Sequence, residues 1–170
     1  MGNEMTLDRV YKASYVLNEV VRTTDLLHAP KIKPGVDLYL KTENLQVTGS
    51  FKVRGAYYKI SQLSPEEKAR GVVACSAGNH AQGVALGSQA NNIKAKIFVP
   101  STAPISKVEA TKRYGAEVVL VDGIYDDAYA AACEEVERTG AVFVHPFDDP
   151  DVIAGQGTIA LELIEQNNGL

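Results

Sequence analysis

The sequence of 170 residues contains few of the residues that build cross-linked or metal-bound cores. It has no tryptophan, two cysteines and three histidines. Cys75 and Cys133 lie in different kinds of segment, so we expect free thiols and no disulfide framework. His28, His80 and His145 are far apart and show no metal-ligand spacing, so we expect no structural zinc and no other metal site.

Long apolar runs and clusters of one charge are also missing. No run approaches the about 18 to 20 residues of a membrane-spanning helix, and residues 1–8 lack the apolar core of a signal peptide. The 17 basic residues are scattered, and with 21 acidic residues they give a net charge of −4. These features predict a cytoplasmic protein that binds neither a membrane nor nucleic acid.

From residue 72 onwards, short apolar runs alternate with helical segments. Strands are predicted over Val72–Ser76, Lys96–Pro100, Glu117–Val121 and Ala141–Val144, and helices over Asn79–Asn91, Pro104–Tyr114 and Tyr125–Arg138. This alternation is typical of parallel strands joined by right-handed crossovers. We therefore predict an α/β fold with an open, mostly parallel sheet that binds its ligands at the carboxyl ends of the strands.

The first 70 residues predict a less regular region. The pattern indicates a helix capped by Thr6, a strand, a helix capped by Ser50 and a short helix with a capping box, over residues 7–21, 37–42, 51–63 and from 64 onwards. Another helix is predicted over residues 152–170.

Lys52 stands out because it falls in the first turn of a predicted helix. The helix macrodipole disfavours a cation there, and the charge of Arg54 acts in the same direction, so both are expected to lower the pKa of Lys52. A neutral amine is what Schiff-base chemistry with carbonyl groups requires. These residues alone leave open that Lys52 simply points into solvent.

Residues 76–81 (Ser-Ala-Gly-Asn-His-Ala) lie where a predicted strand ends and a helix begins. Successive backbone N–H groups at such a place form an anion site that fits a carboxylate or a phosphate. Asn79 adds an amide donor and His80 adds a ring. The alternatives are a glycine-containing turn capped by Asn79, and a capping or core-edge histidine.

Three further motifs are interpreted as structural. Residues 155–160 fit G-x-G-x-x-A, but residues 146–151 separate them from the preceding strand, so the glycines indicate close helix packing or a hinge. Cys75 is interpreted as a core thiol. The last helix is preceded by Asp148, Asp149 and Asp151. Acidic side chains stabilise a helix N-terminus, so these three are interpreted as structural.

Three ordered motifs, at residues 41–56, 76–85 and 152–162, resemble those of threonine dehydratases, in particular the catabolic threonine ammonia-lyases. These are pyridoxal phosphate enzymes of the tryptophan synthase β-like fold (fold type II). The resemblance implies a three-layer α/β architecture and α,β-elimination of L-threonine or L-serine, which yields 2-oxobutanoate and ammonia from threonine. It also implies a homo-oligomer that serves isoleucine biosynthesis or threonine catabolism.

The resemblance also implies roles for individual residues. Lys52 matches the lysine that forms a Schiff base with pyridoxal phosphate and moves the substrate α-proton, and Phe51 matches a residue that packs against the cofactor. The Asn79 side chain matches the one that bonds the phenolic oxygen of the cofactor. The backbone amides that hold the substrate carboxylate are those of Ser76, Ala77, Gly78, Asn79 and His80.

The resemblance further implies a division of the chain. Residues 1–42 would begin a large domain, residues 43–150 would form a small domain, and residues 151–170 would return to the large domain, whose remainder is absent. The chain is thus expected to be an N-terminal fragment, inactive alone, with the phosphate-binding loop beyond Leu170.

Three alternatives remain beside threonine/serine ammonia-lyase, and one of them, the β-replacing synthases of this fold, is disfavoured because their substrate loops usually read differently. Serine racemases of the same family carry a serine before the loop glycine, where this chain has Ala77, so efficient racemisation is not expected. The third is a non-catalytic truncated module that associates with the full-length enzyme.

Overall fold

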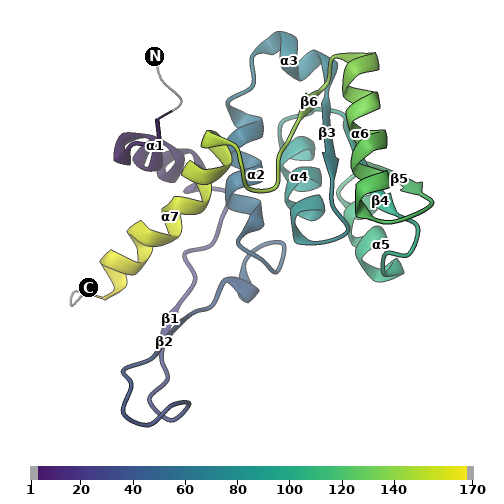
Figure 1. The fold of residues 1–170 in the computed structure, drawn as a ribbon. Helices are drawn as coiled ribbons and strands as arrows, with labels where there is room; N and C mark the ends of the chain where they lie inside the picture. Colours follow the sequence, from purple (N-terminus) through teal and green to yellow (C-terminus); the bar gives the residue numbers. More distant parts are fainter. Residues whose placement is uncertain (1–3, 168–170) are drawn as a thin grey trace.

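The computed structural model describes residues 4–167. Its centre is a four-stranded parallel sheet in the order β5-β4-β3-β6 (Figure 1). The strands are β3 (Val72–Cys75), β4 (Ala95–Pro100), β5 (Glu117–Val121) and β6 (Val142–Phe143). The prediction of an α/β fold with a parallel sheet is confirmed, and β5 has the predicted bounds.

Helices cover both faces of this sheet. Side chains alternate along β3, so Val72 and Ala74 join one core and Val73 and Cys75 join the other. The first core is closed by α4 (Asn79–Ala90) and α5 (Ile105–Arg113), and the second by α6 (Tyr125–Thr139). Cys75 is fully buried, and burial raises the pKa of its thiol to about 11, as expected for a core thiol.

The helix that carries Lys52 packs mainly against two other helices. This helix, α2 (Lys52–Ser61), packs between α4 and the last helix, α7 (Pro150–Gln166). The first helix, α1 (Leu7–Leu17), packs on α7, so the first and last helices of the described chain lie side by side (Figure 1). The short helix α3 (Pro65–Arg70) has the predicted capping box.

A hairpin protrudes from this body, seen at the bottom of Figure 1. It pairs β1 (Leu26–His28) with β2 (Tyr39–Lys41) in antiparallel register, and the short 3-10 helix η1 (Glu43–Leu45) follows. Only the second strand was predicted, because the two apolar residues of β1, Leu26 and Leu27, are adjacent and show no alternation.

The helix boundaries correct several predictions. The cap of α2 is Phe51, and Ser50 Oγ lies 3.4 Å from the Lys52 backbone nitrogen, so the helix begins one residue later than predicted. The helix predicted from Val152 begins at Pro150, because the Asp149 carboxylate accepts hydrogen bonds from the first-turn amides. Its predicted last three residues, 168–170, lie outside the described residues.

Glycines let α2 approach both neighbouring helices. A Cβ at Gly155 of α7 would lie 2.6 Å from the Arg54 carbonyl oxygen, and one at Gly83 of α4 would lie 3.1 Å from the Lys52 carbonyl oxygen. A Cβ at Gly55 would meet α7 in the same way, 2.6 Å from the Val152 carbonyl oxygen. The interpretation of the glycines at 155–160 as close helix packing is confirmed.

A buried arginine fixes α2 to the N-terminal segment and to α7. Arg54 is 1% exposed, and its guanidinium donates to Glu43 at 2.8 and 2.9 Å and to Glu162 at 2.6 and 3.0 Å. Glu162 also pairs with Lys41 at 2.5 Å, so two cations and two carboxylates balance one another. Because each charge has a partner, the cluster holds three chain segments together.

Substitution of Gly155 by alanine tests the close crossing. Gly155→Ala places a Cβ against backbone and should lower the free energy of unfolding by about 1 to 3 kcal/mol in urea denaturation. Gly157→Ala is the matched control, since its Cβ would meet only Val10 side-chain atoms at 3.2 and 3.3 Å. An unchanged unfolding midpoint for Gly155→Ala would contradict the crossing.

The Arg54 cluster should make stability depend on acid. Burial raises the pKa of Glu43, but hydrogen bonds from Arg54 and Thr24 outweigh this effect and hold that pKa below its ordinary 4.5. The Glu43 carboxylate therefore stabilises the folded protein fully above pH 4.5, and this stabilisation is lost as the pH falls through the folded pKa.

Glu43→Gln should cost about 2 kcal/mol of unfolding free energy at pH 7. The difference in unfolding free energy between Glu43→Gln and the unmodified protein should shrink below about pH 4.5. Glu109→Gln, which removes a half-exposed pair with Lys112, is the control and should change little. A pH-independent difference for Glu43→Gln would contradict the account.

Candidate functional site

The strand order creates a crevice between β3 and β6. The chain leaves β3 through α4 to β4 on one side, whereas β6 pairs on the other side of β3. The loops that follow β3 and β6 therefore diverge at their carboxyl ends. In an open α/β sheet this is the place where ligands bind.

Lys52 reaches this crevice from the first position of α2. Its Nζ donates a hydrogen bond to the Pro146 carbonyl oxygen at 2.8 Å, in the loop that follows β6. Burial lowers the pKa of Lys52, as desolvation disfavours the charged amine. The amine also lies 5.3 Å from the centre of the neighbouring Phe51 ring, which is partly exposed.

The expected effect of Arg54 on Lys52 is wrong. The Arg54 guanidinium is bound by Glu43 and Glu162, and burial, not the charge of Arg54, lowers the pKa of Lys52. Residues two apart on a helix point in different directions, so a charge close in sequence can be distant at the amine. The prediction of a lowered pKa is confirmed, but its cause is desolvation.

The loop after β3 has an open side. Gly78 precedes α4, its backbone N–H lies 3.2 Å from Ser76 Oγ, and Asn79 begins the helix with an exposed side chain. A Cβ at Gly78 would meet only the Lys107 Nζ, at 3.7 Å. The loop thus leaves room for an anion beside its amides, with a cation from α5 close by.

Lys107 was missed by sequence reasoning. It lies 29 positions after Gly78 and belongs to α5, so no local pattern linked it to the loop. Only the packing of α5 beside α4 brings this amine to Gly78. The Pro146 carbonyl was missed for the same reason, because a backbone acceptor has no signature in the sequence.

His80 does not point into the loop as a ligand. It is 3% exposed, and its Nε2 lies 2.9 Å from the Val144 carbonyl oxygen. Burial, together with smaller effects of the nearby Lys52 and His145, lowers the pKa of His80 to about 4, although the bond to Val144 opposes the shift. The ring is thus a core-edge group, and only the backbone of His80 remains available for an anion.

Aromatic rings line the loop after β6. The His145 and Phe147 rings meet edge to face at 4.6 Å, and His145 Nδ1 accepts hydrogen bonds from the Phe147 and Asp148 amides at 3.2 and 2.7 Å. Phe143, at the end of β6, lies 6.2 Å from the His145 ring. These contacts turn the chain sharply at Pro146.

The acidic residues before α7 have structural partners. Asp149 caps the helix and pairs with Lys59 at 2.8 Å, and Asp151 pairs with Arg9 at 2.8 Å. Within residues 4–167 no group of three or more His, Cys, Asp or Glu side chains could hold a metal ion. The structural interpretation of Asp149 and Asp151 agrees with these contacts.

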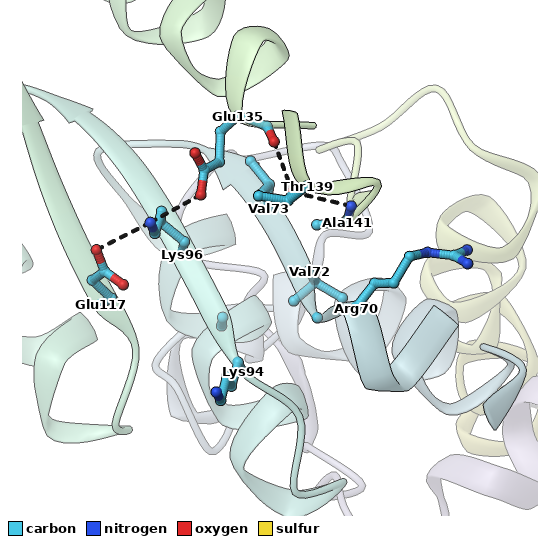
Figure 2. Close-up of a pocket in the computed structure, with 11 residues that line it drawn as sticks. Arg70, Val72, Val73, Lys94, Lys96, Glu117, Glu135, Thr139 and Ala141 are labelled. Carbon is cyan, nitrogen blue, oxygen red and sulfur yellow. Dashed lines mark hydrogen bonds and ion pairs between the residues drawn. The ribbon is translucent and has the colours of Figure 1, made fainter. Parts of the chain in front are cut away.

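A separate cavity of about 200 Å³ lies at the opposite, amino-terminal end of the strands. Figure 2 shows Lys96 there between Glu117 and Glu135, at 3.3 and 2.9 Å. Because its central lysine is bound by two carboxylates and the cavity is far from the β3–β6 crevice, we assign the site to Lys52 and the loop at 76–80.

The residues of the crevice suit an aldehyde cofactor and an amino-acid carboxylate. Lys52 provides an amine whose lowered pKa favours its neutral form, and the amides beside Gly78 provide anion donors with open space around them. The residues present therefore fit pyridoxal phosphate at its aldehyde end.

In the part of the chain that the structure describes, no helix has the length and apolar character required to cross a bilayer.

Comparison with known proteins agrees with this chemistry. The family model described as pyridoxal-phosphate dependent enzyme matches residues 17–170. An L-threonine ammonia-lyase of Thermotoga maritima is 55% identical over 163 residues, which cover 95% of this chain and 41% of that protein. A catabolic L-threonine dehydratase of Escherichia coli is 55% identical over 129 residues, 76% of this chain and 39% of that protein.

Solved structures extend the comparison to the fold. A threonine deaminase isoform from Solanum lycopersicum superposes with a TM-score of 0.88 at 41% identity, over 97% of this chain and 47% of that one. Maize serine racemase gives a TM-score of 0.92 at 36% identity, over 97% and 51%. The tryptophan synthase β-like fold expected from the motifs is confirmed.

The state of His80 can be measured directly. Nitrogen chemical shifts of the ring, followed by NMR during a pH titration, should show a neutral imidazole down to about pH 4. Because the folded pKa is below the ordinary 6.5, His80 should reduce stability as the pH falls below that value. Titration of His80 near pH 6.5 would contradict its burial.

Proposed function

Because this chain belongs to the family of pyridoxal-phosphate dependent enzymes, we propose that its protein is a threonine/serine ammonia-lyase. The proposed reaction converts L-threonine to 2-oxobutanoate and ammonia by α,β-elimination. The observation that carries the proposal is the amine of Lys52 at the β3–β6 crevice, in a chain 55% identical to an L-threonine ammonia-lyase.

Lys52 is the proposed catalytic residue. Its amine would attach the cofactor and would then take the α-proton of the substrate. Burial supports both roles, because a lysine with a lowered pKa is neutral in a larger fraction of molecules and can act as nucleophile and base. The Pro146 carbonyl holds the amine at the crevice. Phe51 is the proposed contact of the cofactor ring.

The loop at 76–80 is the proposed site of the substrate carboxylate. The backbone amides of Ala77, Gly78, Asn79 and His80 would donate to it, and Lys107 would add a positive charge beside Gly78. The Ser76 amide, which was also expected there, donates instead to the Phe98 carbonyl oxygen at 3.2 Å. We infer that the Asn79 side chain, which is exposed at the start of α4, bonds the phenolic oxygen of the cofactor.

Pyridoxal phosphate, when bound, supplies the electron sink that makes loss of the α-proton possible. We propose that its phosphate is held by a loop beyond Leu170 in a longer protein. The chain spans about 40% of the length of the first curated relatives it matches, which supports this placement.

The division of the chain into residues 1–42, 43–150 and 151–170 remains part of the proposal. Its support is that α1 and α7 pack on each other, whereas the sheet helices form separate cores. We also propose a cytoplasmic homo-oligomer in isoleucine biosynthesis or threonine catabolism. The biosynthetic and catabolic names of the relatives and the free thiols are consistent with these proposals.

Serine racemase is the second candidate, because two racemase structures superpose on the chain. Ala77 disfavours it, since a methyl group cannot exchange a proton with the substrate. A non-catalytic module that associates with the full-length enzyme is the third candidate, to be recognised by binding without turnover.

The roles are tested with pyridoxal phosphate and borohydride. In the full-length protein, borohydride reduction should leave the cofactor on the peptide that contains Lys52, as found by mass spectrometry. Lys52→Ala should lower 2-oxobutanoate formation from threonine by at least about a hundredfold. Lys59→Ala is a matched control on the same helix that should keep the labelling at Lys52.

The 170-residue chain should be labelled poorly and should not turn over threonine, because the proposed phosphate loop is missing. Stoichiometric labelling at Lys52 together with turnover would overturn that part. Labelling of the full-length protein at a different lysine would overturn the assignment of Lys52, and D-serine formation as fast as deamination would favour the racemase.

A further inference from the structure

The segment after β6 is held by two motif side chains at alternate carbonyl groups. His80 Nε2 lies 2.9 Å from the Val144 carbonyl oxygen, and Lys52 Nζ lies 2.8 Å from the Pro146 carbonyl oxygen. One contact comes from α4 and the other from α2, so both helices hold the segment. A contact that fixes the Val144 carbonyl therefore also constrains the Pro146 carbonyl, two residues later.

His80 binds where the sheet ends. The pairing of β6 with β3 covers only Val142 and Phe143, and the Val144 amide makes one more bond, to the Val73 carbonyl at 2.8 Å. Val144 is fully buried, so its carbonyl needs a donor in place of water. The His80 ring supplies it at the residue where the chain leaves the sheet.

Geometry determines the form of the ring. A carbonyl only accepts hydrogen bonds, so Nε2 must carry the proton that points to Val144. Nδ1 is buried and has no hydrogen-bond partner within residues 4–167. A second proton there would be a buried charge close to Lys52, which is unfavourable. The ring is therefore a fixed, neutral donor.

We propose that His80 is a positioning residue that fixes the segment after β6 and, through the Pro146 carbonyl, holds the Lys52 amine in the crevice. The inference rests on the proposed role of Lys52 only for its importance to catalysis. The contact chain from His80 to Val144, Pro146 and Lys52 belongs to the protein without cofactor and can be tested there.

The test measures the reactivity of the Lys52 amine. The purified protein without cofactor is labelled with trace acetic anhydride at a series of pH values, and mass spectrometry gives the extent of labelling at each lysine. His80→Leu removes the donor and should release the segment. Water should then reach Lys52, and its pKa should rise toward the ordinary value, with about a tenfold lower neutral fraction for each unit of rise.

Two variants control for general damage. His80→Gln keeps an N–H donor near the position of Nε2 and should restore most of the labelling. Ser88→Ala changes another buried polar side chain of α4 that has no hydrogen-bond partner among the described residues, and it should leave Lys52 labelling unchanged. In the full-length protein, His80→Leu should lower kcat for threonine with little change in KM, and His80→Gln should recover it.

Several results would overturn the proposal. They are unchanged Lys52 labelling in a folded His80→Leu protein, failure of His80→Gln to differ from His80→Leu, or an equal change in Ser88→Ala. If His80→Leu does not fold, NMR of the unmodified protein decides, because the Nδ1–H tautomer of His80 would contradict the contact with Val144. If the labelling changes as expected but the unmodified full-length protein with pyridoxal phosphate does not turn over threonine, the proposed function is refuted and the positioning role stands.

Discussion

A buried arginine is the constraint on which the arrangement of this molecule depends. Arg54 is 1% exposed and cannot lose its proton, so the chain must bring carboxylates to it. Glu43 comes from the segment after the hairpin and Glu162 from the last helix. Removal of one carboxylate from such a cluster leaves a buried charge without full compensation, which destabilises the folded state. The requirement therefore holds distant segments at one side of α2.

The glycine contacts explain how α2 also reaches the sheet layer. Backbone from α4 and α7 approaches α2 at Gly83 and Gly155, where any larger residue would meet main-chain atoms. With both sides packed, the first turn of α2 can point only toward the β3–β6 crevice. The lowered pKa of Lys52 follows from this burial. Fold and chemistry are linked because the contacts that hold the helix also desolvate its amine.

Much of the fold could be predicted because the sheet region is locally consistent. Each strand from β3 to β5 is a short apolar run followed by a helix, and the predicted bounds differ by at most one residue. The motif residues Lys52 and Asn79 were found because they lie at helix starts. The strand β1 was missed because its two leucines are adjacent and show no alternation.

Contacts between segments far apart in sequence could not be predicted. Proximity in sequence suggested that Arg54 acts on Lys52, but the guanidinium binds carboxylates on the other side of the helix. Lys107 and the Pro146 carbonyl reach the site only through packing. Sequence analysis left open whether the His80 ring meets a ligand or lies at the edge of the core, because the sequence does not show that Val144 needs a donor.

Hydrogen exchange of the Arg54→Met protein tests the central claim most directly. The account predicts faster exchange of backbone amides in α7 and in residues 22–24, while amides of β3 and β4 keep their protection, because Arg54 holds the outer segments to α2. Exchange that is unchanged in α7, or that rises equally in the sheet and in α7, would contradict the account.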